Sequence, residues 1–166
     1  MHLNFICKDI ADSYQSTAEL KFVIGGLLYT IADFMIFFAP NKNSYKRYTT
    51  KSMTTPHNIS WGYNNRTTAL RILKNSKGNP RIEHRVSGSD ANPLKVASAM
   101  LCGAYLGLRE QITPIPPTYG LAFDPQYNLT SLPTTLTEAK KNFTKSKFSD
   151  MFSSHQTKCE EYTSFR

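Results

Sequence analysis

The sequence is poor in the residue arrangements that build metal and disulfide sites. It has three cysteines, an odd number without a Cys-x-x-Cys pair, and four histidines that form no His-x-His or His-Glu-x-x-His arrangement. These spacings exclude the common zinc motifs and give no closed disulfide framework. We therefore expect a reducing location such as the cytoplasm.

The sequence gives no indication of secretion, and it shows no repeats. The apolar start of the chain is too short for a signal peptide, and Lys8 and Asp9 follow it at once. No internal repeat or low-complexity tract interrupts the 166 residues. With 40% hydrophobic residues, nine Tyr and ten Phe, the composition predicts one globular domain rather than a disordered chain.

Negative charge is in short supply. Twenty Lys and Arg stand against twelve Asp and Glu, which gives a formal net charge of +8. Such a balance favours acidic partners, namely nucleotides, carboxylate substrates, nucleic acid or anionic membrane surfaces. Charge alone does not choose among these classes.

The longest apolar run covers residues 22–39 and carries one charge, Asp33. Its apolar residues recur at steps of three and four, which predicts one long helix from Thr17, a candidate cap, to Ala39 before Pro40. Its length approaches that of a membrane span, so the run by itself leaves a transmembrane helix open. The Gly25-Gly26 pair predicts close packing against another backbone.

The remaining elements are shorter and more polar. Residues 41–57 read as a long surface loop. Three strand-like runs follow at residues 59–63, 68–73 and 81–86, and we expect the last two to pair antiparallel across a turn at residues 74–80. Two further helices are predicted, one from Pro93 to Arg109 with Asp90 or Asn92 as its cap, and one within residues 135–148.

Five arginines lie within 39 residues of these strands and loops: Arg47, Arg66, Arg71, Arg81 and Arg85. On a strand, Arg81, Glu83 and Arg85 point to one face, which is ordinary for a solvated strand. Converging guanidinium groups, however, also match phosphate and carboxylate oxygens. The carboxylate among them could neutralise the arginines or hold a divalent cation, and the pattern leaves both open.

Three segments of the chain resemble consecutive signatures in the catalytic domain of the glutamine synthetase family. They are "APNKNSYKRY", "SWGYNNRTTALRIL" and "RIEHRVSGSDANPLKVASAMLCGAYLGL", and they stand in family order and at nearly family spacing. The likeness extends from about Phe22 to about Glu138. It implies an α+β fold in which antiparallel strands are backed by long helices, with residues 1–166 as a partial catalytic domain. It also makes residues 22–39 a buried helix rather than a membrane span.

The resemblance implies roles for the residues near glutamate. Arg47 and Arg85 match family positions that hold the carboxylates of the glutamate substrate. Glu83 matches a ligand of the divalent metal, Mg²⁺ or Mn²⁺, that orients the transferred phosphate.

The remaining arginines match positions that act on ATP. Arg66, Arg71 and Arg81 would face its phosphates and the phosphorylated intermediate, with Arg66 and Arg71 as the catalytic residues. The implied enzyme is an ATP-dependent ligase that phosphorylates the γ-carboxylate of glutamate, after which ammonia or an amine displaces the phosphate. Positive charge at the site would compensate the charge on the transferring group.

Departures from the family qualify this interpretation. Glutamine synthetases proper carry a glutamate soon after the NSYKR motif, whereas residues 48–56 contain no acid. In lacking this acid and in its motif "SWGYNNR", the sequence resembles the γ-glutamylamine ligase branch of the family, whose acceptor is an amine or polyamine. Leu94 also replaces the usual Tyr of the NPY motif.

Much of the family pattern has no counterpart here. The sequence does not match the family's N-terminal β-grasp domain, its first metal-binding glutamates or the histidine that precedes this region. Full-length members of the family are expected to form ring-shaped homo-oligomers. We therefore expect the chain by itself to be an incomplete and inactive fragment. The alternative is a basic nucleic-acid-binding or non-catalytic interaction module, suggested by the net charge and by "YKRY". The resemblance implies neither a nucleic-acid nor a membrane partner.

Overall fold

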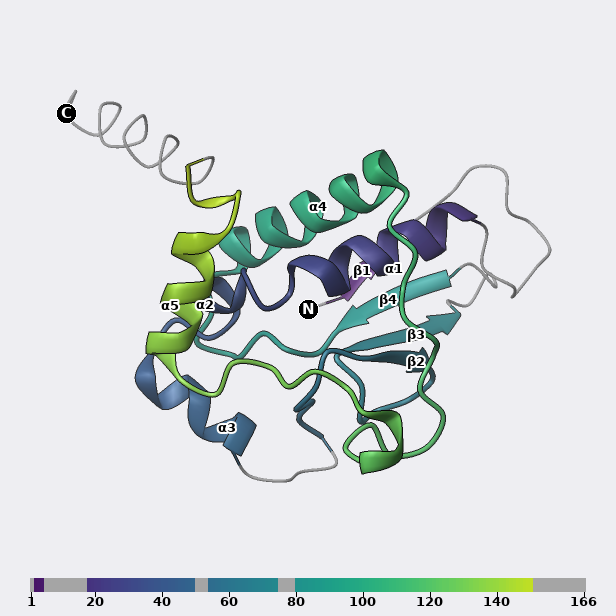
Figure 1. Ribbon diagram of the computed structural model, residues 1–166, viewed down its shortest axis with the longest axis horizontal. Helices are drawn as coiled ribbons and strands as arrows, with labels where there is room; N and C mark the ends of the chain where they lie inside the picture. Colours follow the sequence, from purple (N-terminus) through teal and green to yellow (C-terminus); the bar gives the residue numbers. More distant parts are fainter. Residues whose placement is uncertain (1, 5–17, 50–53, 75–79, 151–166) are drawn as a thin grey trace.

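A four-stranded sheet with helices stacked above it forms the centre of the fold (Figure 1). The structure is a computed structural model that describes residues 2–4, 18–49, 54–74 and 80–150. The strand order is β1-β4-β3-β2, with β1 at His2–Asn4, β2 at Trp61–Tyr63, β3 at Leu70–Lys74 and β4 at Pro80–His84. The expected α+β class is confirmed.

The predicted strand pairing is confirmed for the two longest strands. β4 runs antiparallel to both β3 and β1, while β2 runs parallel to β3. Residues 75–79 of the predicted turn lie outside the described residues. The mixed sheet therefore departs from the expected antiparallel arrangement only at its β2 edge.

The register gives the sheet one apolar and one charged face. The pair Ile72 and Ile82 is buried on one face, as is the neighbouring His84. Arg71 pairs with Glu83 in the same register, so these two side chains share the opposite face. The predicted alternation along residues 81–85 is confirmed by the burial of Ile82 and His84 between less buried neighbours.

The helix predicted over residues 17–39 is interrupted. α1 covers Ala18–Thr30 and α2 covers Met35–Phe38, and four turn residues separate them. The Thr30 hydroxyl donates to the carbonyl of Gly26 at 3.0 Å, a back-bond that bends helices. Thr17, the expected cap, lies outside the described residues. None of the helices in the described part of the chain has the length and hydrophobicity of a membrane span.

α4 covers Pro93–Glu110 and packs against α1 through glycines. A Cβ atom at Gly26 would overlap the carbonyl oxygen of Gly103, and one at Gly107 would overlap that of Phe22. The expected close approach at the Gly25-Gly26 pair is thus confirmed, with α4 as the neighbour of Gly26. The cap is Asn92, whose side chain accepts from the backbone of Leu94 and Lys95.

Residues 42–49 are helical, so the surface loop predicted over residues 41–57 is wrong there. A 3-10 helix, η1, covers Lys42–Tyr45, and α3 follows at Lys46–Thr49. The physical reason is that Tyr45 and Tyr48 are buried, which anchors a segment whose composition is otherwise polar.

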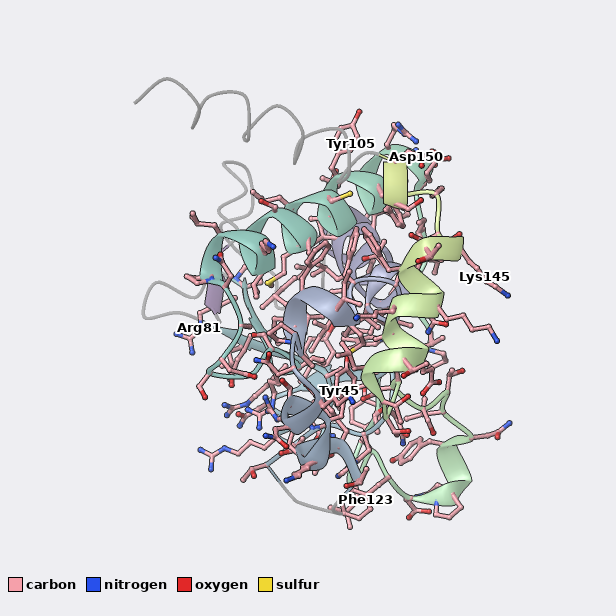
Figure 2. All side chains as sticks on the ribbon, turned by 90° about the vertical axis from the view of Figure 1, so that its left-hand side faces the viewer. Tyr45, Arg81, Tyr105, Phe123, Lys145 and Asp150 are labelled. Atoms are coloured by element: carbon pink, nitrogen blue, oxygen red, sulfur yellow. The ribbon has the colours of Figure 1, made fainter. Side chains whose placement is uncertain are left out.

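The C-terminal part of the described chain closes the apolar core from one side. After a 3-10 helix, η2, at Pro125–Tyr127, α5 covers Leu136–Lys145 within the predicted range. The Thr135 hydroxyl caps it by accepting from the backbone of Glu138. Figure 2 shows α5 along one side of the molecule and Tyr105 pointing outward from α4.

The glycine contact between α1 and α4 predicts a large effect of Gly26→Ala. The added methyl group meets backbone that no rotamer change can move, so we expect the free energy of unfolding to fall by about 2 kcal/mol. The loss should outweigh the gain of about 1 kcal/mol in helix propensity. Urea unfolding measures it, with Ser98→Ala on the exposed face of α4 as the control. Equal stability of the two variants would contradict the packing.

His84 predicts a pH dependence of stability. It is 2% exposed, its ring lies 4.4 Å from that of Phe38, and burial lowers its pKa to about 3. The unfolded chain binds this proton below about pH 6.5. Stability from His84 is therefore fully present above pH 6.5 and is lost as the pH falls toward 3. The urea midpoint should fall less steeply with decreasing pH in His84→Gln than in the native chain. An equal pH dependence in the two proteins would refute the role of buried His84.

Candidate functional site

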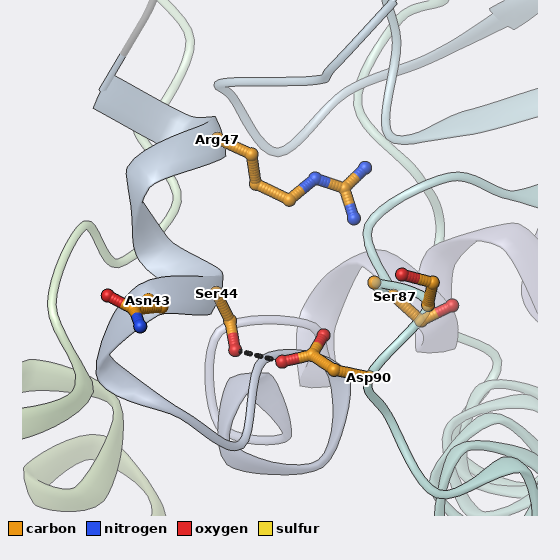
Figure 3. A pocket seen from close by; sticks show the side chains of 7 residues that line it. Asn43, Ser44, Arg47, Ser87 and Asp90 are labelled. Atoms are coloured by element: carbon orange, nitrogen blue, oxygen red, sulfur yellow. Dashed lines mark hydrogen bonds between the residues drawn. The ribbon is translucent and has the colours of Figure 1, made fainter.

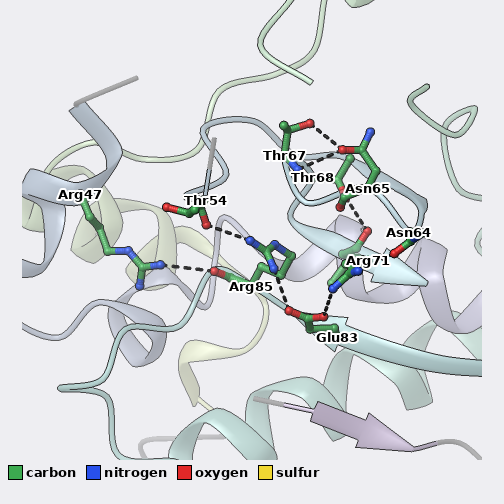
Figure 4. Close-up of polar contacts among 10 residues, drawn as sticks. Arg47, Thr54, Asn64, Asn65, Thr67, Thr68, Arg71, Glu83 and Arg85 are labelled. Carbon is green, nitrogen blue, oxygen red and sulfur yellow. Dashed lines mark hydrogen bonds and ion pairs between the residues drawn. The ribbon is translucent and has the colours of Figure 1, made fainter. Parts of the chain in front are cut away.

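Glu83 lies between two arginines on the charged face of the sheet (Figure 4). Its Oε2 accepts from Arg71 Nη1 at 3.1 Å, and its Oε1 accepts from Arg85 Nη1 at 2.7 Å. The three side chains are only 13 to 15% exposed. Both carboxylate oxygens are thus engaged, and the pair of ion pairs fixes the two guanidinium groups relative to each other.

Neighbouring backbone and amide groups complete this network. Arg71 Nη2 donates to Asn64 Oδ1, and Arg85 Nη2 donates to the carbonyl of Thr54 at 2.9 Å. Asn64 follows β2 with φ +48°, a left-handed conformation that asparagine tolerates better than most residues. The arginines are therefore held from three places in the chain: the sheet itself, Asn64 at the end of β2, and Thr54 in the segment that leads into β2.

Arg47 joins the network from α3. Its guanidinium donates to the carbonyls of Val86, at 3.3 Å, and of Arg85, at 3.5 Å. It also lies 5.3 Å from the ring of Tyr48. The Tyr48 hydroxyl donates to the same Val86 carbonyl at 2.5 Å. The structure thus brings both residues predicted for glutamate, Arg47 and Arg85, to one place.

Arg81 lies on the same sheet face two residues before Glu83. Its Nε is buried and has no hydrogen-bond partner among the described residues. The same holds for Nε of Arg71 and Nε of Arg85 within that part of the chain. Since buried N–H groups are normally satisfied, three such donors on one face are suited to an external anion.

Arg66 is the predicted site residue that the structure does not bring into this network. It is exposed on the turn between β2 and β3, and no hydrogen bond among the described residues joins it to the other arginines. The turn itself is well anchored. Asn65 Nδ2 donates to the carbonyls of Thr118 at 3.0 Å and Gly120 at 2.7 Å, and the Thr67 hydroxyl donates to Asn65 Oδ1.

The electrostatics keep Glu83 charged. Burial raises the pKa of its carboxyl, but the charges and hydrogen bonds of Arg85 and Arg71 outweigh this and hold the pKa below its usual range. Along this sheet face, Arg71 and Arg85 flank a single carboxylate and Arg81 lies two residues before it on β4, which leaves a surplus of positive charge. Such a surface is suited to binding phosphate or carboxylate groups.

The described residues do not form a divalent-metal site. They contain no group of three or more His, Cys, Asp or Glu side chains that could hold a metal ion. Glu83 stands alone, with both oxygens already accepting from arginines whose charge would repel a cation. Glu83 as a ligand of Mg²⁺ or Mn²⁺ stays a prediction that needs ligands from outside the described residues.

A polar pocket of about 540 Å³ opens beside Arg47 (Figure 3). It lies between the η1–α3 segment and the loop that leads from β4 to α4. The residues that line it are Asn43, Ser44, Arg47, Ser87, Gly88, Ser89 and Asp90.

Sequence reasoning assigned no part in the site to Asn64, Thr54 or Asp90. Asn64 holds Arg71, the Thr54 carbonyl holds Arg85, and Asp90 accepts from Ser44 in the pocket wall. The asparagine pair at the end of a predicted strand was a visible signal for Asn64. A backbone carbonyl such as that of Thr54 leaves no trace in the sequence.

Comparison with known proteins decides the family. The glutamine synthetase catalytic-domain family matches residues 4–166, nearly the whole chain. The chain belongs to this family. The resemblance predicted from the three motifs is thereby confirmed.

Relatives include enzymes named for several amine acceptors. The chain is 42% identical over 93 residues to the gamma-glutamylputrescine synthetase PuuA of Escherichia coli K12. The matched region covers 56% of this chain and 20% of PuuA. It is 34% identical over 158 residues to the type-1 glutamine synthetase 2 of Dictyostelium discoideum, covering 89% of this chain and 30% of that one. A gamma-glutamylethanolamide synthetase of Streptomyces coelicolor is 30% identical over 145 residues. This match covers 83% of the present chain and 30% of the Streptomyces protein.

Solved structures agree in fold. The ADP complex of GmaS has a TM-score of 0.69 at 23% identity, covering 82% of this chain and 33% of the GmaS chain. A ligand-free GmaS structure gives a TM-score of 0.67 at 25% identity and covers 31% of that chain. The chain thus spans between a fifth and a third of the length of the relatives and structures described.

The double ion pair predicts that Glu83→Gln destabilises the fold. The amide keeps one acceptor and presents a donor to the second arginine, so we expect the free energy of unfolding to drop by about 2 kcal/mol. Because the folded pKa of Glu83 is lowered, its contribution in the native chain is present above the unfolded value, near pH 4.5, and is lost as the pH falls through the folded value. Urea unfolding at pH 7 and pH 3 tests this. If the difference in unfolding free energy between the native chain and Glu83→Gln were as large at pH 3 as at pH 7, the charged role of Glu83 would be contradicted.

Proposed function

We propose that the chain carries one wall of the active site of an ATP-dependent carboxylate-amine ligase. The reaction joins the γ-carboxylate of glutamate to ammonia or an amine through γ-glutamyl phosphate. Membership of the glutamine synthetase family supports the reaction class. The observation that carries the proposal is the arginine face of the sheet, where three buried Nε donors have no partner among the described residues.

Arg71 and Arg81 bind phosphate groups of ATP in this proposal, and Arg66 joins them from its turn. Both sheet arginines reach the charged face from paired strands, and each keeps a free Nε donor there in the described part of the chain. Fixed guanidinium groups stabilise a phosphoryl group in transfer because they compensate its charge without reorganising. Glu83 holds Arg71 in place rather than acting on the substrate directly.

Arg47 and Arg85 hold the carboxylates of glutamate. Arg85 is fixed by Glu83 at 2.7 Å and by the Thr54 carbonyl, so it offers a rigid donor. Arg47 makes only long hydrogen bonds of 3.3 and 3.5 Å, which it can exchange for stronger charge-assisted bonds to a carboxylate. The two arginines thus combine a fixed and an adjustable contact.

We infer that the acceptor is an amine rather than ammonia. Residues 48–56 contain no acid to deprotonate ammonium. Several relatives are named for amines, among them the gamma-glutamylputrescine synthetase and a glutamate-isopropylamine ligase of Pseudomonas. The metal ligands other than Glu83, the opposite wall and the ring-shaped homo-oligomer of the proposed enzyme involve residues beyond those described here.

Nucleotide binding tests the proposal. In isothermal titration calorimetry of the full chain with ADP, Arg81→Ala should weaken binding roughly tenfold, since a charge-assisted contact to a phosphate is lost. Arg109→Ala is the matched control because Arg109 is an exposed arginine on α4 that pairs with Glu110.

Two results would overturn the proposal. One is the absence of ADP binding by the native chain together with tight, steeply salt-dependent binding of a DNA duplex, which would favour a basic nucleic-acid-binding module. The other is equal loss of ADP affinity in both arginine variants, which would show that only overall charge matters.

A further inference from the structure

We propose that Asp90 is a positioning residue that fixes Arg47 for glutamate. Its carboxylate latches the η1–α3 segment, which carries Arg47, onto the loop that follows Arg85. The inference rests on the proposed function for its ligand, and on the hydrogen bonds of the described residues for the latch itself.

The latch joins segments that are far apart in the sequence. Asp90 Oδ2 accepts from Ser44 Oγ at 2.6 Å (Figure 3). It also accepts from Asn41 Nδ2 at 3.1 Å. Ser44 Oγ in turn accepts from the backbone N–H of Asn41 at 3.0 Å, so its own proton is directed to Asp90. These hydrogen bonds hold the pKa of Asp90 below its usual range, and the carboxylate is charged at neutral pH.

Asp90 is not needed to begin the helix that follows it. Asn92 is the cap of α4, and its side chain accepts from Leu94 and Lys95. The carboxylate of Asp90 instead points back to η1, forty-six residues earlier in the chain. Its hydrogen bonds therefore serve the contact between two segments rather than the local helix.

A second contact closes the other end of the same segment. The Tyr48 hydroxyl donates to the Val86 carbonyl at 2.5 Å, next to the hydrogen bonds of Arg47. Asp90 and Tyr48 thus pin the two ends of a short helical segment, and Arg47 lies between them, one residue before Tyr48.

The long bonds of Arg47 explain why a latch is required. At 3.3 and 3.5 Å from its two carbonyl partners, the guanidinium is weakly held and can turn toward a ligand. Its backbone must then be fixed by other groups if the charge is to remain in reach of Arg85. Gly88 lies between the two side chains and lets them approach the loop, because a Cβ there would lie 2.6 Å from Asp90 Oδ1 and 3.3 Å from Arg47 Nη1.

The experiment compares Asp90→Ala with Ser89→Ala, a neighbouring exposed residue of the same pocket. Hydrogen exchange followed by mass spectrometry should show roughly tenfold faster exchange over residues 41–48 in Asp90→Ala, as expected for the loss of hydrogen bonds to a charged group. L-Glutamate binding, measured by calorimetry, should weaken roughly tenfold in the same variant. ADP binding, which uses other arginines, should be unchanged.

Two further variants separate the latch from a general loss of structure. Asp90→Asn keeps an oxygen acceptor for Ser44 and should restore most of the glutamate affinity. Ser44→Ala and Asp90→Ala combined should weaken glutamate binding by less than the sum of their separate effects, because both remove the hydrogen bond between Ser44 and Asp90 while Ser44→Ala alone removes the one from Asn41 N–H.

The outcomes are distinct for the two proposals. Unchanged exchange over residues 41–48 in Asp90→Ala would overturn the latch, whatever the ligands do. An equal fall in glutamate and ADP affinity would overturn the positioning role. If the native chain bound neither ligand, the proposed function would fail, and the exchange measurement would still decide whether the latch exists.

Discussion

The charged face of the sheet depends on one carboxylate. Glu83 takes a hydrogen bond from each of two arginines on its flanks, at 3.1 Å from Arg71 and 2.7 Å from Arg85. Without it, two largely buried guanidinium groups would lie near each other with no compensating charge, which would destabilise the fold. With it, the arginines are fixed in place while donors on each remain for a ligand. Because both its oxygens already accept from arginines, this carboxylate is poorly suited to hold a metal ion together with the other described residues.

The rest of the fold keeps this face in place. Ile72, Ile82 and His84 fill the other face of the same strands, so the register that buries them also sets the arginines outward. Glycines let α1 and α4 approach closely. The segments that carry Arg47 and Arg66 are then anchored by hydrogen bonds to distant parts of the chain.

Local sequence signals predicted much of this arrangement. The two-residue period of residues 81–85 indicated which side chains share a face, and the helical spacing and caps located α4 and α5. The interruption of the first helix after Thr30 was missed because it depends on a side-chain bond to the backbone that the hydrophobic spacing does not reveal. The partners of the arginines were missed for a different reason. Asn64, the Thr54 carbonyl and Asp90 act across long sequence separations, and their roles depend on how segments meet in space.

The central claim is that the arginine face binds the anionic part of a nucleotide through donors that the chain itself does not use. Nitrogen-15 NMR of the arginine Nε–H groups of the full chain, with and without ADP, tests it most directly. The signals of Arg71 and Arg81 should shift on addition of ADP, while that of Arg109 stays in place. A shift confined to Arg109 and other exposed arginines, or no shift at all, would contradict it.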